Sequence, residues 1–312
     1  MKRHGIIPAL GCLLLMACGG SGSAPADDSM SEVNIAVDET LQPIMEEELK
    51  VFNARFPDAI LNERYVPETD ALNLLLEDSL RLVLATRPLT ESEQKSIWDV
   101  YQLKTRQQKV AYDAVALIQN RENPDSLITV GDVKRILNGT ITTWKELGSS
   151  LKGDIEVVFD NSNSSLVRYV RDSICGGQDF KGIVKEGGDN RKVIEYVAQT
   201  PGALGIVSVD WLRNPADTSR LTFDPSIRVM SVSSSAVAED GNSFQPFEYY
   251  IATGQYPWIR TIYMITTDPR QRSMGLNFYF FVSDEAGQLI ITQSSQLLPI
   301  MPVHIRSVDV VD

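Results

Sequence analysis

Three loops of this 312-residue chain carry polar groups between an apolar run and a segment of helical spacing. The loops are Asp38-Glu39-Thr40, Thr86-Arg87 with Thr90, and Asn161-Ser162-Asn163-Ser164-Ser165. Helix N-termini offer unpaired N–H groups and a partial positive charge, so three such loops that meet in one crevice would bind a small anion. The alternative is that each hydroxyl only caps its own helix. The recurrence of the pattern favours an anion site, and the capping alternative stays open.

Alternating strands and helices must position these loops. Apolar runs predict strands at residues 33–37, 81–86, 111–118, 155–159 and 203–209. Helical patterns cover residues 41–56 before Pro57, begin at a capping box at 90–93 and at Thr129, and follow Ser164 as an N-cap. This rhythm predicts an α/β fold with parallel sheets, in which loops at the carboxyl ends of strands gather at one edge.

Composition and charge limit the function. The chain has 29 Lys and Arg against 41 Asp and Glu, a formal charge of −12. This acidity excludes the basic stripe that nucleic-acid binding requires. The same field repels anions at long range, so an anion site must depend on short hydrogen bonds and one or two local cations. The length and the 43% hydrophobic content suffice for two globular domains.

The N-terminus predicts a secretion signal over residues 1–17. Lys2 and Arg3 precede an apolar run that ends in Leu15-Met16-Ala17-Cys18-Gly19, a lipobox. We expect lipidation of Cys18, which would anchor the mature chain to a membrane of the bacterial cell envelope, on its periplasmic or outer face. Small polar residues to position 31 form a flexible tether. The alternative, a buried helix or a membrane span, conflicts with the shortness of the run.

Histidine and cysteine are scarce. Beyond residue 18 only His304 and Cys175 remain, which removes most zinc sites and most nucleophiles activated by histidine. We therefore expect no metal, no cofactor and no catalytic residue, and we interpret Cys175 as a buried structural thiol. The enzyme alternative is a hydrolase that uses Ser164 or Ser165, although the chain has no Gly-x-Ser-x-Gly elbow.

Several fragments carry a family resemblance. They are TRPLT at 86–90, AVALIQN at 114–120, SLIT at 126–129, ILNGTITTWKELG at 136–148, TPGALG at 200–205 and YPWIRTIY at 256–263. In this order they resemble the phosphate-binding proteins of bacterial phosphate ABC transporters, over nearly the whole mature chain. The resemblance implies a two-lobed, type II-like periplasmic-binding-protein fold, with hinge strands and a ligand in the cleft between the lobes.

The resemblance also implies domain bounds. After the signal peptide (1–17) and the lipidated tether (18–31), lobe one comprises residues 32–112 and 225–312, and lobe two comprises residues 113–224. The crossing strands are expected near 110–115 and near 205–228. Asp113, a polar residue within an apolar run, would then lie at the hinge.

The ligand loops depart from the family pattern. Family members usually have an Arg, then an acidic residue, then Ser-Gly-Thr at the helix of lobe two, where this chain has Asp160, Ser162 and Ser164-Ser165-Leu166. One cation is therefore lost, and Arg87 or Arg168 is the candidate replacement, because a guanidinium can hold a tetrahedral oxyanion through two hydrogen bonds. The alternative is that both arginines pair with surface carboxylates. The predicted ligand-binding residues are Asp38, Glu39, Thr40, Thr86, Arg87, Asn163, Ser164, Ser165 and Arg168.

The resemblance implies a function in transport. We expect a monomeric, lipid-anchored solute-binding protein that captures phosphate or a related small oxyanion and delivers it to the permease subunits of an ABC transporter. The altered ligand loops keep an alternative open, namely a sensory or scavenging lipoprotein whose cleft is not coupled to transport.

Overall fold

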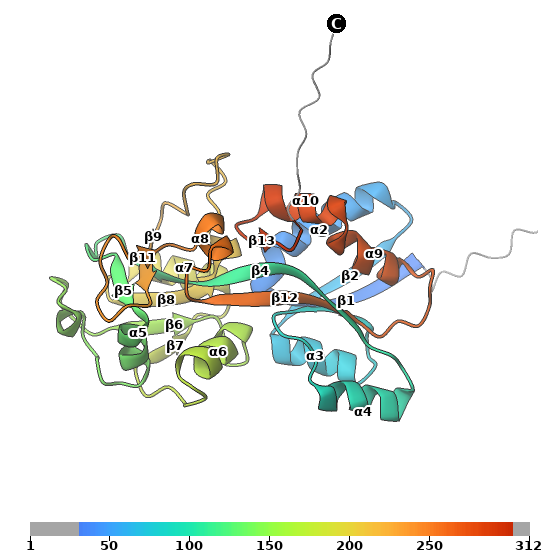
Figure 1. The fold of residues 1–312 in the computed structure, drawn as a ribbon, viewed down its shortest axis with the longest axis horizontal. Helices are drawn as coiled ribbons and strands as arrows, with labels where there is room; N and C mark the ends of the chain where they lie inside the picture. The colour runs from blue at the N-terminus through green and yellow to red at the C-terminus, as the bar shows by residue number, and fades with distance from the viewer. Residues whose placement is uncertain (1–30, 302–312) are drawn as a thin grey trace, which may run out of the picture.

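The computed structural model describes residues 31–301, so the predicted signal peptide, Cys18 and His304 lie outside the described residues. Two α/β lobes are joined by two long strands, β4 (Arg106–Gln119) and β12 (Ile259–Thr266) (Figure 1). One curled sheet runs through both lobes in the order β2-β1-β3-β12-β4-β8-β6-β7. The expected two-lobed α/β fold is confirmed.

The first lobe contains three parallel strands, β2 (Ile60–Val66), β1 (Glu32–Asp38) and β3 (Leu82–Ala85). Side chains of β1 alternate between two apolar clusters, because Ile35 packs with helix α2 on one face and Ala36 packs with helix α3 on the other. Strands buried on both faces are continuously apolar, which is the pattern of a parallel sheet between helices. The helical elements of this lobe are η1 (Glu39–Leu41), α2 (Gln42–Arg55), α3 (Glu68–Leu76), α4 (Glu91–Tyr101), α9 (Met274–Ser283) and α10 (Glu285–Ser294).

The second lobe contains parallel β6 and β7 beside β8, which pairs with the far half of β4. A small sheet of order β11-β10-β5 lies next to them (Figure 1). The strands of the second lobe are β5 (Leu127–Thr129), β6 (Glu156–Phe159), β7 (Val184–Glu186), β8 (Ala203–Ser208), β9 (Arg228–Val229), β10 (Ser231–Ser233) and β11 (Ser243–Phe244). Its helical elements are α5 (Val130–Leu137), η2 (Trp144–Leu147), α6 (Ser165–Tyr169), the π-helical turn η3 (Val170–Ile174), α7 (Asn190–Gln199), η4 (Val209–Leu212) and α8 (Glu248–Ala252).

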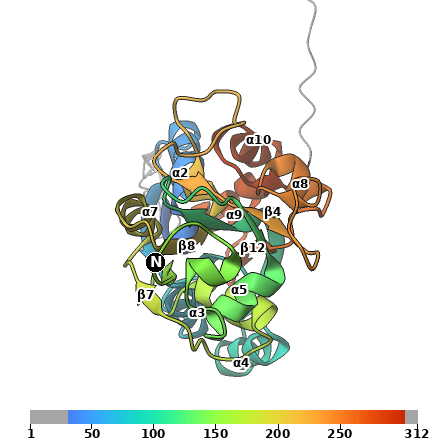
Figure 2. The same cartoon turned by 90° about the vertical axis from the view of Figure 1, so that its left-hand side faces the viewer.

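Helices cover both faces of the sheet in the second lobe. Leu117 of β4 belongs to the apolar cluster that includes α5, whereas its neighbour Ile118 belongs to the cluster that includes α7. Figure 2, viewed from the end of this lobe, shows α7 and α5 on different sides of β8. At Gly205 of β8, an added Cβ would lie 2.7 Å from Ile118 Cγ1 and 2.8 Å from Val197 Cγ2. Only glycine therefore allows α7 to pack this closely on the sheet.

The crossing strands differ in part from the expected ones. As expected, the first crossing is β4, whose residues 106–114 pair with β12 and whose residues 115–119 pair with β8. The second crossing is β12, and the expectation of a crossing at residues 205–228 is wrong because β8 and β9 both pair with the far half of β4. Since β9 pairs with the far half of β4, β10 pairs with β5, and Figure 1 shows α8 beside these strands, we propose that residues 225–252 belong to the second lobe and that the other lobe bounds stand as expected.

Several local predictions are confirmed. Thr90 and Glu93 form the capping box of α4, Ser164 caps α6, and α2 ends before Pro57. Cys175 is a buried free thiol, and burial raises its pKa. No helix between residues 31 and 301 is both long and apolar enough to cross a membrane. The strand β13 (Leu298–Pro299) completes the described chain by pairing with β4.

Candidate functional site

Three distant segments meet where the lobes join. Thr40 lies in η1 directly after β1, Ser165 is the first residue of α6 in the second lobe, and Arg260 lies on the crossing strand β12. All three residues are buried, and the hydroxyl oxygens of Thr40 and Ser165 are 3.4 Å apart. Two of the three predicted loops therefore converge on one point, which is the arrangement that the sequence predicted for them.

The Arg260 guanidinium is the centre of this site. Its Nη2 donates to Thr40 Oγ1 at 2.8 Å and its Nη1 donates to Ser165 Oγ at 2.6 Å, so that one side chain contacts both lobes. Its Nε donates to Asp113 Oδ2 at 2.7 Å. A buried guanidinium needs a compensating charge and hydrogen-bond acceptors, and Asp113 with the two hydroxyls gives each of its three nitrogens one acceptor. We call Thr40, Ser165 and Arg260 the central cluster.

Asp113 is held from the other side by the second lobe. Its Oδ1 accepts from Ser208 Oγ at 2.9 Å, and the backbone N of Ser208 donates to Asn190 Oδ1 at 3.0 Å. Asn190 Nδ2 in turn donates to Asp160 Oδ2 at 3.0 Å. Burial raises the pKa of both Asp113 and Asp160, although the Arg260 charge opposes this for each of them. The expected hinge position of Asp113 thus carries a hydrogen-bonded ion pair.

Asp38 orients Thr40. Its Oδ1 accepts from the backbone N of Thr40 at 3.1 Å and from Thr40 Oγ1 at 3.0 Å. The other carboxylate oxygen, Oδ2, is buried and has no hydrogen-bond partner. Burial raises the pKa of Asp38 to about 6, and the Arg260 charge opposes this rise. Asp38 therefore offers one unused acceptor beside the hydroxyl donors of the central cluster.

Two of the remaining loop residues, Asn161 and Asn163, form contacts between the lobes, and Ser164 does not. Asn161 Nδ2 donates to Glu39 Oε1, and burial raises the pKa of Glu39 to about 7. Thr69 Oγ1 donates to the backbone O of Asn163 at 3.5 Å, while the Asn163 side chain is exposed. Ser164 Oγ accepts from Leu166 N at 3.0 Å, so this hydroxyl caps its own helix. The capping alternative therefore holds for Ser164 but does not account for Ser165.

Two further contacts join the lobes around the central cluster. Trp211 Nε1 donates to the carbonyl oxygen of Thr40 at 2.9 Å, and the backbone N of Ile44 donates to Asp210 Oδ2 at 2.9 Å. The second contact satisfies an N–H in the first turn of α2. Burial raises the pKa of Asp210 to about 8. The lobes are thus closed on each other, with polar contacts in place of open space at the centre.

Thr86 and Arg168 meet at a second point, around Glu68. Glu68 Oε1 accepts from Thr86 N and from Thr86 Oγ1, each at 2.7 Å, and Glu68 Oε2 accepts from Arg168 Nε at 2.6 Å. Arg168 Nη2 also donates to Glu68 Oε1 at 3.3 Å and to Thr86 Oγ1 at 3.0 Å. We call Thr86, Arg168 and Glu68 the lateral cluster. Arg168 crosses between the lobes here and pairs with a buried carboxylate.

Arg87 is placed elsewhere. Its Nη1 and Nη2 donate to the two carboxylate oxygens of Glu93 at 2.9 and 2.8 Å, at the start of α4. Its Nη1 also donates to the carbonyl oxygen of Pro88 at 3.0 Å. The Glu93 charge and these hydrogen bonds favour the alternative in which Arg87 pairs with a carboxylate. That Arg87 contacts a ligand stays a prediction.

Sequence reasoning missed Arg260 and Glu68 as site residues. Arg260 lies in the fragment YPWIRTIY, which was noted only for its resemblance. The available signal was an arginine in a strand-like run, where alternation places Arg260 on the same face as Ile262 and Met264. An arginine at a buried strand position needs an acidic partner, and Asp113 in the other apolar strand was the obvious candidate.

This arrangement is suited to binding rather than to metal chemistry. Hydroxyl and guanidinium donors at one point, with a neighbouring carboxylate acceptor, are complementary to an anion that itself carries a proton. Between residues 31 and 301, no three His, Cys, Asp or Glu side chains are grouped so that they could hold a metal ion. Carboxyl groups nevertheless outnumber guanidinium groups around the centre. The carboxyl groups are those of Asp38, Glu39, Glu68, Asp113 and Asp160, and the guanidinium groups are those of Arg168 and Arg260.

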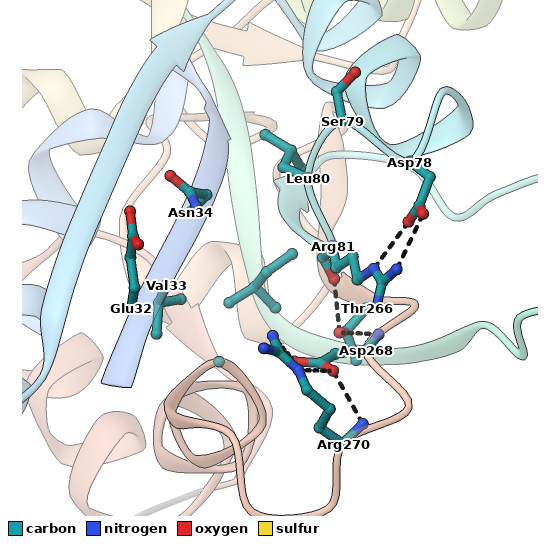
Figure 3. Close-up of a pocket in the computed structure, with 12 residues that line it drawn as sticks. Glu32, Val33, Asn34, Asp78, Ser79, Leu80, Arg81, Thr266, Asp268 and Arg270 are labelled. Atoms are coloured by element: carbon teal, nitrogen blue, oxygen red, sulfur yellow. Dashed lines mark hydrogen bonds and ion pairs between the residues drawn. The ribbon is translucent and has the colours of Figure 1, made fainter. Parts of the chain in front are cut away.

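A separate pocket lies at the opposite ends of β1 and β3, with a volume of about 180 Å³ (Figure 3). Arg81 and Arg270 line it, and Figure 3 shows each of them beside an aspartate. Arg81 Nε donates to Asp78 Oδ1 at 2.9 Å, and Arg270 Nε donates to Asp268 Oδ1 at 2.9 Å. The charges of the two arginines are matched within the pocket, so we assign it no ligand.

Comparisons with known proteins agree with the two-lobed fold. A family model described as a PBP superfamily domain matches residues 19–285. The phosphate-binding protein PstS of Borreliella burgdorferi is 23% identical over 282 residues, which cover 86% of this chain and 91% of that protein. The phosphate-binding protein PstS of Bacillus subtilis is 24% identical over 257 residues, which cover 78% of this chain and 76% of that protein.

Solved structures give the same result. A putative phosphate ABC transporter substrate-binding protein with bound phosphate from Clostridium perfringens superposes with a TM-score of 0.70 at 20% identity, over 86% of this chain and 100% of that chain. An ABC-type phosphate transport receptor from Vibrio cholerae superposes with a TM-score of 0.63 at 21% identity, over 86% of this chain and 100% of that chain. At these identities, the structural likeness establishes the fold.

Proposed function

The chain belongs to the PBP superfamily, and from this premise we propose that it is a solute-binding protein that holds phosphate or a related small oxyanion between its lobes for an ABC transporter. The relatives named above as phosphate-binding proteins and phosphate transport receptors support the ligand class. These relatives are binding proteins rather than enzymes. In this chain the two candidate nucleophiles of the hydrolase alternative have other roles, since Ser164 caps a helix and Ser165 is hydrogen-bonded to Arg260.

The observation that carries the proposal is the central cluster. Thr40, Ser165 and Arg260 come from the first lobe, the second lobe and the crossing strand, so an anion bound among them would be contacted by both lobes at once. The hydroxyl oxygens of Thr40 and Ser165 are 3.4 Å apart, which is too close for a tetrahedral anion to lie between them. The lobes must therefore separate for the anion to enter and close again around it, as in other hinged binding proteins.

Asp38 provides a criterion for the choice of oxyanion. Its unpartnered Oδ2 accepts a hydrogen bond from an oxyanion that carries a proton, such as phosphate or arsenate near neutral pH. Sulfate carries no proton there and would face the carboxylate as a like charge. The raised pKa of Asp38, about 6, and of Glu39, about 7, lowers the negative charge of the walls as the pH falls toward these values.

Calorimetry on the purified domain from residue 31 onward tests this function. We expect heat of binding with phosphate and arsenate and at least about tenfold weaker binding of sulfate, which corresponds to 1.4 kcal/mol. Arg260→Met should weaken phosphate binding by about ten- to a hundredfold, because it removes charge-assisted hydrogen bonds. Arg81→Met is the matched control, since Arg81 lies in the pocket at the far ends of β1 and β3. No binding of any of the three anions by the folded wild-type domain would refute the proposal.

Lipid anchoring and location in the cell envelope are part of the same proposal. The lipobox around Cys18 and the small polar segment that follows it support attachment by acyl chains. Metabolic labelling with a radioactive fatty acid should mark the full-length protein. The variant Cys18→Ser should lose the label and remain unprocessed, and a labelled Cys18→Ser protein would contradict the anchor.

The alternative function is a sensory or scavenging lipoprotein that does not serve transport. The acidic surroundings of the central cluster favour it, because carboxylates at the cleft weaken the capture of an anion. Phosphate uptake by cells that lack the protein separates the two. Normal uptake in the deletion strain, together with phosphate binding by the purified domain, would favour the alternative over the transport function.

A further inference from the structure

Glu68 occupies a set of donors that has the composition of an anion site. The backbone N and the hydroxyl of Thr86 donate to its Oε1 at 2.7 Å each, and Arg168 Nε donates to its Oε2 at 2.6 Å. These are a strand-end amide, a hydroxyl and a guanidinium, which are the groups that proteins use to bind phosphate and carboxylate ligands. The occupant in this chain is its own carboxylate, which is only 2% exposed.

The sheet places Glu68 beside the central cluster. In the strand order β2-β1-β3, Glu68 follows β2, Asp38 ends β1, and Thr86 follows β3. In the register of β1 and β3, Val37 is paired with Leu84, so Thr86 and the Asp38-Glu39-Thr40 loop lie about one strand spacing apart, roughly 5 Å. The central and lateral clusters are therefore neighbouring parts of one cleft. The negative charge of Glu68 also acts on Asp38, whose pKa it helps to raise.

We propose that Glu68 is a specificity-determining residue, a built-in anion that fills the lateral cluster and restricts the cleft to a ligand with one small oxyanion group. A ligand with two linked anionic groups, such as pyrophosphate, would need both clusters, and its second group would meet the Glu68 carboxylate. The lateral cluster also joins the lobes, since Glu68 lies on α3 and Arg168 lies on α6. This inference rests on the proposed function for the central cluster and adds the reason why larger anions are excluded.

The test compares phosphate with pyrophosphate in calorimetry and in thermal unfolding. Wild-type protein should bind phosphate and bind pyrophosphate at least about tenfold more weakly. Glu68→Ser vacates the lateral cluster and leaves Thr86 and Arg168 without their anion, so pyrophosphate affinity should rise about tenfold or more and pyrophosphate should raise the melting temperature of this variant. Glu68→Ala serves as a second variant if the serine variant does not fold.

Two matched variants identify the cause of such a gain. Glu68→Gln keeps the volume of the side chain, so the lateral cluster stays filled and pyrophosphate affinity should rise less than in Glu68→Ser. In Glu68→Ser/Arg168→Met the cationic donor is removed, and the gain should be lost. A gain that persists in this double variant would show that pyrophosphate binds elsewhere and would overturn the proposal.

The failure of this proposal differs from the failure of the proposed function. If wild-type protein binds neither phosphate nor arsenate, the proposed function fails, and the premise of this proposal fails with it. If wild-type protein binds pyrophosphate as tightly as phosphate, Glu68 does not restrict the cleft. If the folded serine or alanine variant shows no gain, the lateral cluster is not an anion site.

Discussion

Two acidic residues buried near the crossing strands, Asp113 and Glu48, have opposite surroundings. Both carboxylate oxygens of Asp113 are hydrogen-bonded, one to Arg260 at 2.7 Å and one to Ser208 at 2.9 Å. Glu48 of α2 is 2% exposed, and neither of its carboxylate oxygens has a partner. It faces a small cavity lined by apolar side chains, among them Val110 of β4 and Ile262 of β12.

This difference shows how the fold uses buried charge. Burial raises the pKa of both residues, but Arg260 opposes the rise for Asp113, whereas nothing opposes it for Glu48, whose pKa reaches about 9. Glu48 is therefore protonated and neutral at neutral pH, and its carboxyl group has no hydrogen-bond partner. Asp113 instead links the crossing strands to both lobes through Arg260. A buried charge contributes to the site only where partners from several elements compensate it.

Breaking the Asp113–Arg260 pair should have the largest effect. Asp113→Asn removes the carboxylate that is hydrogen-bonded to the buried Arg260 guanidinium and should lower the free energy of unfolding by about 3–5 kcal/mol. Urea denaturation of the domain followed by circular dichroism measures it. The double variant Asp113→Leu/Arg260→Met removes both charges and should recover most of the loss.

Asp78→Asn is the control for this prediction. It removes the partner of Arg81, whose side chain is 36% exposed, and it should cost less than about 1 kcal/mol because water solvates the remaining charge. A loss as small as this in Asp113→Asn would mean that the buried pair is not needed to compensate Arg260. The contrast between the two arginines would then disappear.

Glu48 should produce a smaller effect, which depends on pH. Its pKa in the folded protein, about 9, lies above the ordinary value of 4.5, so between these values the folded state binds more protons than the unfolded state and stability falls as the pH rises. Glu48→Gln removes this dependence, and we expect a gain of about 2 kcal/mol at pH 8, after the cost of burying an amide. Near pH 5, close to the ordinary value of 4.5, keeping the wild-type carboxyl group protonated in the folded state costs little, so the cost of burying the amide should dominate and the variant should be less stable than wild type by about 2 kcal/mol.

Thermal unfolding at pH 5 and at pH 8 measures this prediction, with Glu47→Gln as the control at the neighbouring position of α2. The stability of Glu48→Gln should still decrease somewhat as the pH rises, because the pKa of buried Asp210 is also raised, to about 8. Equal changes in melting temperature at the two pH values would mean that Glu48 is not the group that titrates.

The sequence predicted best those features that depend on residues close together in the chain. The cap of α6 by Ser164 and the capping box of Thr90 and Glu93 each join residues within one helical turn, so spacing alone reveals them. The contacts of Arg260 reach residues 147, 95 and 220 positions away, and the contact between Arg168 and Glu68 spans 100 positions. Helix and strand periodicity carries no information on such pairs. The position of the loops at the carboxyl ends of strands indicated that they converge, but it did not indicate that Arg260 lies between them.

The partly exposed pair of Arg87 and Glu93 should have the smallest effect on stability of the charged groups compared here. They are six positions apart, and their side chains are 26% and 20% exposed. Hydrogen bonds from Arg87 and from Thr90 lower the pKa of Glu93 to about 2, so this pair stabilises the fold above the ordinary carboxyl pKa and loses its effect as the pH falls through 2. The coupling energy from the cycle of Arg87→Ala and Glu93→Ala should be less than about 1 kcal/mol and should decrease in 1 M salt.

The same Arg87→Ala variant decides the prediction that Arg87 contacts the ligand. If Arg87 only pairs with Glu93, phosphate affinity in calorimetry should change by less than about threefold, which is under 0.7 kcal/mol. A loss of tenfold or more would show that Arg87 leaves Glu93 when the ligand binds. Such a result would also imply that the anion site extends along the carboxyl end of β3, past the lateral cluster, and that the local ion pair seen here is exchanged for a ligand contact.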